Sequence, residues 1–193
     1  MDGVFQVAYL VGLTVGAFIR GWYGIKYRQN RAAIYRQEGF VVGLLASLWG
    51  VAILVPLAHM LTPALDFEDY KLPLAAGWAG VAVFAVCLWL LWRSHVALGA
   101  NFSSTVEVKQ RHVLVTHGVY QHMRHPMYAA HLLWGIAQAL LVHNWIAGPV
   151  SLAVFVPLYF LRVPREERMM LQQFGSEYRS YMNRTGQVSP RFW

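Results

Sequence analysis

Two short clusters of charged and aromatic residues hold the side chains of this sequence that could do chemistry. The first is Arg124-His125-Pro126-Met127-Tyr128 and the second is Arg162-Val163-Pro164-Arg165-Glu166-Glu167. Proline suits the first position of a helix, so Pro126 predicts a helix start with unpaired backbone N–H groups and the positive end of the helix dipole. Such a helix start can bind a carboxylate or a phosphate.

The second cluster places opposite charges at helical spacing. Arg162 and Glu166 are four residues apart and are neighbours on one face if a helix runs through Pro164. A local ion pair, or anchoring of the basic residues to lipid head groups, is the simpler interpretation of either cluster alone. Acidic residues are nevertheless scarce, since Asp and Glu together number nine. Ionisable residues at a membrane boundary are candidates for function.

The composition indicates the environment in which these clusters lie. The chain has 193 residues, of which 57% are hydrophobic and 13% are charged. Soluble domains have about 25% charged residues, so this composition argues against a soluble globule and against a disordered chain. The single cysteine, Cys87, excludes an intrachain disulfide and a cysteine-based metal cage.

Five apolar stretches without Lys, Arg, Asp or Glu account for most of the chain. Crossing a bilayer core of about 30 Å takes about 20 helical residues, so we expect a single all-α integral membrane domain with five transmembrane helices. The first stretch lacks a basic flank and a cleavage pattern, and we expect it to be retained rather than removed as a signal peptide. The predicted spans lie near residues 3–19, 39–61, 72–92, 126–142 and 145–161.

The basic residues predict the orientation of these spans. All but one of the 16 Lys and Arg residues lie in segments that alternating spans place on one side, and the exception is Lys71. The positive-inside rule then puts the N-terminus outside and the C-terminus in the cytoplasm of a cell (inner) membrane. The net charge of +7 is thereby explained by topology and anionic lipids, which makes nucleic acid an improbable partner.

The cytoplasmic segments, 93–125 and 162–193, are long enough to form a small cap. Alternation in Thr105–Lys109 and His112–Thr116 favours a short extended hairpin. Pro164 suits the first turn of a tail helix, Gly175 marks an expected break, and Pro56 is expected to kink the second span. Only His143 and Asn144 separate the last two spans, which favours a tight antiparallel helix pair.

Clustered histidines raise the possibility of a metal or a haem. Five histidines lie between His112 and His131, but none has H-E-x-x-H spacing, and no Cys, Asp or Glu completes a tetrahedral set. We therefore expect no metal site. His131, inside the fourth span, is expected to bond to a neighbouring helix.

In order along the chain, several motifs resemble the isoprenylcysteine carboxyl methyltransferase family, including its compact prokaryotic members. They are His112-Val113-Leu114-Val115-Thr116, Gly118-Val119-Tyr120, Arg124-His125-Pro126-Met127-Tyr128, Arg162, Glu166-Glu167 and Phe174-Gly175-Ser176-Glu177-Tyr178. The matching region covers roughly residues 99–185. A lone R-H-P-x-Y would be weak, whereas the ordered set is specific.

The resemblance implies an integral-membrane methyltransferase that uses S-adenosylmethionine and releases S-adenosylhomocysteine, without a Rossmann domain. By the same resemblance, Arg162 is the catalytic residue that holds the acceptor, and Glu167 also lies at the acceptor. The implied cofactor contacts are His112, Val113, Leu114, Val115, Tyr120, His125, Pro126, Met127, Tyr128 and Glu166.

The implied acceptor is the carboxylate of a lipophilic, isoprenylcysteine-like molecule, and no obligate protein partner is inferred. A carboxylate with a pKa of about 3.5 is already ionised at neutral pH and needs positioning rather than a general base. An amine acceptor, as in phospholipid methylation, would need a base such as Glu167 or His125. A thiol acceptor, an NADPH-dependent sterol-reductase-like enzyme and a non-enzymatic electron carrier remain alternatives.

Overall fold

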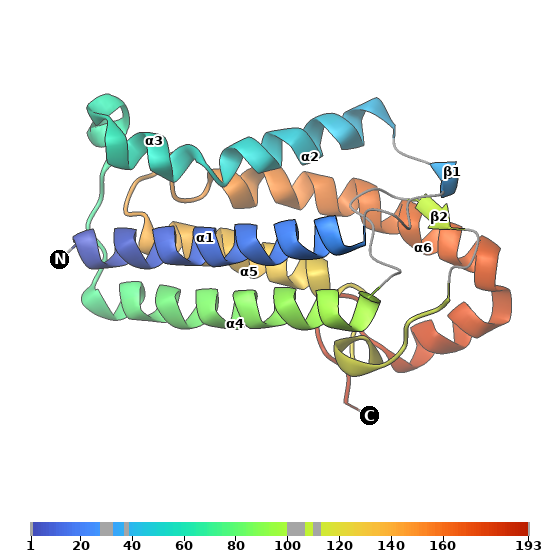
Figure 1. The fold of residues 1–193 in the computed structure, drawn as a ribbon. Helices are drawn as coiled ribbons and strands as arrows, with labels where there is room; N and C mark the ends of the chain where they lie inside the picture. The colour runs from blue at the N-terminus through green and yellow to red at the C-terminus, as the bar shows by residue number, and fades with distance from the viewer. Residues whose placement is uncertain (1, 28–32, 37–38, 100–106, 110–112, 193) are drawn as a thin grey trace.

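The computed structural model describes residues 2–27, 33–36, 39–99, 107–109 and 113–192. These residues form a helical bundle with two short strands at one end (Figure 1). The elements are α1 (Asp2–Lys26), β1 (Ala33–Arg36), α2 (Phe40–Ala52), α3 (Val55–Leu61), the 3-10 turn η2 (Pro63–Glu68), α4 (Leu74–Leu98), β2 (Glu107–Lys109), the 3-10 turn η4 (Gly118–Gln121), α5 (Pro126–Leu141) and α6 (Val150–Arg184).

The helices are those of a membrane protein. Three segments among the described residues are long and apolar enough to cross a bilayer by length and composition, namely Gly3–Lys26, Phe40–Leu61 and Leu74–Leu98. The second of these combines α2, which ends at Ala52, and α3, which begins at Val55. Pro56 lies in the first turn of α3. The kink predicted at Pro56 is therefore confirmed.

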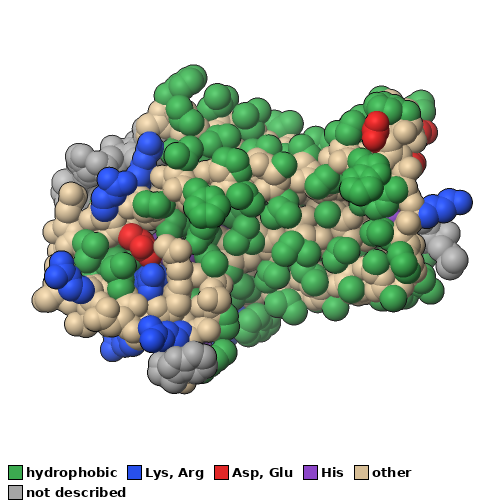
Figure 2. All heavy atoms as spheres, turned by 180° about the vertical axis from the view of Figure 1, so that it is seen from behind, with side chains coloured by type: hydrophobic (Ala, Val, Ile, Leu, Met, Phe, Trp, Pro, Cys, Tyr) green, Lys and Arg blue, Asp and Glu red, His purple; other side chains and the backbone are tan. Residues whose placement is uncertain are grey.

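The surface divides into a hydrophobic middle and two charged ends (Figure 2). Lys and Arg side chains gather at the end that holds the tail of α6, and the opposite end shows acidic side chains. Exposed hydrophobic side chains in between include Phe18 and Trp22 on α1, Val51 on α2, and Trp89 on α4. Large exposed apolar side chains in this number would be unfavourable in water, and they are suited to contact with lipid.

Helix α5 lies at the centre of the bundle, packed against α4, α6 and α1. Gln138 of α5 is fully buried, yet its side chain accepts a hydrogen bond from the Tyr9 hydroxyl at 2.9 Å. Its amide donates to the carbonyls of Ala147 at 2.7 Å and Ala52 at 3.3 Å. An unsatisfied polar group inside a membrane costs several kcal/mol, so these bonds fix how the helices approach one another.

Gly135 lies where α5 packs against α6, and the contact leaves no room for a side chain. A Cβ there would lie 2.8 Å from the Leu152 Cβ and 2.9 Å from the Leu152 Cα. We expect Gly135→Ala to destabilise the protein by about 1–3 kcal/mol because the two backbones must move apart. Thermal unfolding in detergent measures this loss.

Gly43 provides the matched control for this substitution, because it lies in α2 and a Cβ there meets nothing within 4 Å. Gly43→Ala should leave the melting temperature unchanged or raise it, since alanine favours helix over glycine. A Gly135→Ala protein that melts at or above the wild-type temperature would contradict the close packing.

The predicted pairing of residues 105–109 with 112–116 is wrong in the part of the chain that the structure describes. Strand β2 pairs antiparallel with β1, which follows α1, and Val113–Thr116 is not in a strand. Alternation of apolar and polar residues predicts a strand but does not predict which strand it pairs with, and here the pairing strand comes from a distant segment. His112 lies outside the described residues.

The connection between α5 and α6 is longer than the two residues predicted, since α5 ends at Leu141 and α6 begins at Val150. Asn144 shapes this loop, because its side-chain oxygen accepts hydrogen bonds from the backbone N–H groups of Ile146 at 3.0 Å and Ala147 at 2.8 Å. Such hydrogen bonds from a side chain to nearby backbone groups compete with helix formation, so the apolar residues after Asn144 do not at once form a helix.

Pro164 does not begin a new helix, contrary to the prediction, because α6 continues through Pro157 and Pro164. A proline inside a helix removes one hydrogen bond, a loss that packing can offset. Val163, next to Pro164, is buried in the contact of α6 with α2. The predicted break at Gly175 is confirmed, since its φ is 53°. The continuous helix aligns Arg162 with Glu166.

Candidate active site

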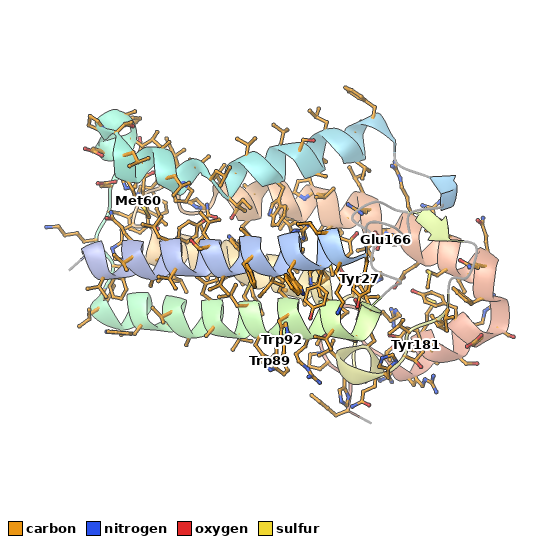
Figure 3. All side chains as sticks on the ribbon, viewed as in Figure 1. Tyr27, Met60, Trp89, Trp92, Glu166 and Tyr181 are labelled. Carbon is orange, nitrogen blue, oxygen red and sulfur yellow. The ribbon has the colours of Figure 1, made fainter. Side chains whose placement is uncertain are left out.

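The two clusters of the sequence meet at the basic end of the bundle. The C-terminal segment makes this possible, because it runs back along the residues that precede α5. The backbone N–H of Arg124 donates to the Gly186 carbonyl at 2.8 Å, and that of His125 donates to the Gln187 carbonyl at 2.9 Å. Figure 3 shows Glu166 and Tyr181 at this end of the molecule, with Met60 at the other end.

Glu166 is the point at which the two clusters join. Its Oε1 accepts hydrogen bonds from the Tyr128 hydroxyl at 2.5 Å and from Arg162 Nε at 3.0 Å. The Nδ1 of His125 lies 3.7 Å from its Oε2. Residues of α6 and of the first turn of α5 thus hold one half-buried carboxylate in a fixed orientation.

Glu167 has a different set of partners and a different role. Its Oε1 accepts from Arg124 Nε at 2.9 Å and from His125 Nε2 at 3.2 Å. Burial alone would raise the pKa of Glu167, but the hydrogen bonds from His125 and Arg124 outweigh it and lower the pKa to about 2. A carboxylate with so low a pKa is ionised at neutral pH and is a weak general base.

The other donors of Arg124 tie this ion pair to the end of α6. Its Nη1 donates to the carbonyls of Met182 at 3.0 Å and Thr185 at 2.5 Å. Arg124 therefore links the start of α5 to the C-terminal segment. This pattern marks Arg124 and Glu167 as residues that fix the site.

The low pKa of Glu167 predicts a specific loss of stability in acid. A carboxylate whose pKa is lower in the folded state stabilises the fold fully above its ordinary value of 4.5, and loses that contribution as the pH falls toward about 2. We expect Glu167→Gln to be less stable than wild type at neutral pH, with the difference narrowing from about pH 5 to about pH 3. Melting temperatures in detergent across this range measure it.

The matched control for this substitution is Glu177→Gln, at an exposed position on the same helix. Its melting temperature should follow the wild-type curve at every pH. Parallel curves for wild type and Glu167→Gln would show that the ion pair does not contribute to stability.

Buried and half-buried tyrosines support the backbone next to the site. The Tyr181 hydroxyl donates to the carbonyl of buried Tyr120 at 2.6 Å, and the Tyr159 hydroxyl donates to the Gln187 side chain at 2.7 Å. Burial raises the pKa of both Tyr120 and Tyr181, so these hydroxyls stay neutral. They hold the backbone of η4 and the C-terminal segment in place.

The structure brings five of the predicted site residues into direct contact: His125, Tyr128, Arg162, Glu166 and Glu167. Pro126 is buried at the start of α5, Met127 is half-buried beside it, and Tyr120 is buried in η4. Val113 is exposed and Leu114 and Val115 are half-buried in the segment before η4. His112 lies outside the described residues, so its predicted contact is not addressed by the structure.

The sequence predicted no site role for four residues that support the site, namely Arg124, Tyr159, Tyr181 and Gln187. Arg124 could have been found, since it stands next to His125 in the first cluster. Gln187 gave no signal, because its contact depends on the return of the chain after α6. Tyr181 repeats at helical spacing with Met170, Phe174 and Tyr178, a pattern that is typical of packing and does not identify a partner.

Comparisons with known proteins give this site its family. The model of the isoprenylcysteine carboxyl methyltransferase family matches residues 78–172. Protein-S-isoprenylcysteine O-methyltransferase A of Arabidopsis thaliana is 30% identical over 141 residues, covering 72% of this chain and 71% of the relative. A probable protein-S-isoprenylcysteine O-methyltransferase of Oryza sativa subsp. indica is 27% identical over 140 residues, covering 72% and 73%.

A solved structure agrees at the level of the fold. The eukaryotic intramembrane Ras methyltransferase, an isoprenylcysteine carboxyl methyltransferase, superposes with a TM-score of 0.58 at 23% identity, covering 98% of this chain and 73% of the other. Fold and site therefore define a helical membrane methyltransferase. The chain belongs to the isoprenylcysteine carboxyl methyltransferase family, which confirms the resemblance seen in its sequence.

Proposed function

We propose that this protein transfers the methyl group of S-adenosylmethionine to the carboxylate of a lipophilic, isoprenylcysteine-like acceptor. The relatives it matches are named for O-methylation of S-isoprenylcysteine. The observation that supports the proposal most directly is the contact of Arg162 and Tyr128 with one carboxylate oxygen of Glu166. An anion-binding cation thus lies beside an anion that can hold a cationic cofactor.

The residues present fit S-adenosylmethionine, which supplies a methyl group on a sulfonium. The N-cap of α5, His125, makes no side-chain hydrogen bond to the first turn, so the N–H groups there can donate to the cofactor's carboxylate. Glu166 can accept from its ammonium or ribose hydroxyls through charge-assisted hydrogen bonds. We assign the remaining cofactor contacts to His112, Val113, Leu114, Val115, Tyr120, His125, Pro126, Met127 and Tyr128.

The acceptor requires orientation more than proton transfer. Its carboxylate, with a pKa of about 3.5, is ionised at neutral pH and is already nucleophilic. A guanidinium presents its N–H donors in a planar fork that matches a carboxylate, so Arg162 suits the acceptor's carboxylate. Alignment of the carboxylate with the methyl group then supplies much of the rate. Glu167, ionised and paired with Arg124, fits a residue that shapes the acceptor side better than a base.

The proposed function fits a topology of five transmembrane spans in which both clusters lie at the cytoplasmic face. The basic end of the bundle then faces the cytosol of a cell (inner) membrane, and the N-terminus lies outside. Residues 93–125 and 162–193 form the cap over the cofactor, while α5 and the part of α6 before Arg162 complete the set of spans. A lipid-attached acceptor can reach this site from the bilayer with its polar end at the interface.

Purified protein incubated with isotopically labelled S-adenosylmethionine and a synthetic prenylcysteine tests the proposal. We expect label in a product that releases methanol in mild base, as a carboxyl methyl ester does and an N-methyl or S-methyl product does not. Calorimetry should show binding of S-adenosylhomocysteine and not of NADPH. Base-stable label on an added phospholipid amine, or affinity for NADPH alone, would overturn the proposal.

A further inference from the structure

Arg20 is a cation inside the bundle that the two clusters do not include. It lies in the last two turns of α1, is half-buried, and places its Nη1 3.0 Å from Nε2 of His131 on α5. His131 is buried. A guanidinium can only donate, so Nε2 of His131 accepts from Arg20 and the proton of the neutral ring is on Nδ1. The predicted bond of His131 to a neighbouring helix is thus confirmed.

The environment of this pair contains no described carboxylate that neutralises Arg20. Among the described residues, no acidic side chain lies within 4.0 Å of Arg20, whereas Arg162 is paired with Glu166. Arg162 is nevertheless close enough to act electrostatically on both Arg20 and His131. Arg20 is therefore a guanidinium that no described carboxylate neutralises.

Trp49 adds a second unsatisfied donor. Its ring on α2 stands edge-on to His131 with centroids 4.4 Å apart. Its indole N–H is buried and has no hydrogen-bond partner among the described residues. A buried donor without an acceptor is costly, and each such group calls for an explanation. Arg20, Trp49 and His131 thus meet from three different helices, α1, α2 and α5.

We propose that Arg20, oriented by His131, binds the carboxylate of the methyl acceptor together with Arg162. Ionisable residues within membrane helices commonly mark the path of a substrate, and an unneutralised guanidinium suits an anion. The acceptor's carboxylate would neutralise Arg20, and the buried indole N–H can supply a further donor. The inference rests on the proposed function and adds the residues that select a carboxylate over a neutral group.

The test compares Arg20→Gln with Lys26→Gln, which removes the same charge from an exposed position of α1. Two ligands with the same prenyl chain are used, a prenylcysteine with a free carboxylate and its carboxamide. We expect Arg20→Gln to raise the KM for the carboxylate acceptor about 10-fold to 100-fold. Inhibition by the carboxamide and the Kd of S-adenosylhomocysteine should stay within about twofold of wild type. Lys26→Gln should resemble wild type throughout.

Each other outcome counts against this role. An unchanged KM for the carboxylate, or an equal loss of affinity for both ligands, would make Arg20 a packing residue. If Arg20→Gln fails to fold, as loss of S-adenosylhomocysteine binding would show, Arg20→Lys decides, because it keeps the charge but lacks the planar fork of donors. We expect it to raise the KM for the carboxylate alone, and a wild-type KM would overturn the inference. A wild-type enzyme that does not methylate the carboxylate refutes the proposed function instead.

Discussion

Replacing Arg162 by alanine is expected to reduce kcat/KM for the acceptor by about 30-fold or more, since truncating one member of a desolvated charge pair costs about 2–5 kcal/mol. Arg162 Nε donates to Glu166 at 3.0 Å, and its guanidinium holds the acceptor in the proposed function. S-Adenosylhomocysteine should still bind, because the first turn of α5 and Glu166 remain. Radiolabel transfer and calorimetry measure the two effects separately.

Two variants make the Arg162 result specific. Arg162→Lys keeps the charge without the planar fork and should recover only part of the activity. Arg168→Ala, at an exposed position of the same helix, is the matched control and should remain within about twofold of wild type. Full turnover by Arg162→Ala would remove Arg162 from the mechanism.

Replacing Glu166 by glutamine is expected to weaken binding of S-adenosylhomocysteine about 10-fold to 100-fold. The change is nearly isosteric and leaves an oxygen for the Tyr128 hydroxyl, so the fold should be preserved. It removes the negative charge, and hydrogen bonds to charged groups contribute about 1.5–3 kcal/mol. Calorimetry on the detergent-purified protein gives the dissociation constant directly.

Glu177→Gln removes the same charge from an exposed position of α6 and should bind S-adenosylhomocysteine as wild type does. A wild-type dissociation constant for Glu166→Gln would mean that Glu166 faces away from the bound nucleoside. In that case the helix start at Pro126 would hold the cofactor without help from the second cluster.

The two clusters were visible in the sequence because their residue types are unusual for their setting. Pro126 predicted the start of α5, and the four-residue spacing of Arg162 and Glu166 predicted a pair on one helix face. The structure shows that pair, at 3.0 Å, and it also shows that α6 continues through Pro164. The spacing rule depended on this continuity, which the proline made doubtful.

Partners far apart in the chain could not be predicted in the same way. Strand β2 pairs with residues 33–36 and not with its neighbour in sequence, because a strand pattern is the same for any partner. The loop at Asn144 and the return of Gln187 to His125 depend on single hydrogen bonds that leave no periodic signal. Arg20 and His131 are 111 residues apart, and nothing in either segment indicates the other.

The sequence by itself determined that this is a helical membrane protein with its charge at the ends, and it determined the family. Hydrophobicity and helix starts are local properties, and an ordered set of motifs is specific even without coordinates. Only the tertiary structure decided which polar side chains meet: Glu166 with Tyr128, Glu167 with Arg124, and Arg20 with His131. Such contacts depend on how helices pack around α5, and packing is set by the whole bundle at once.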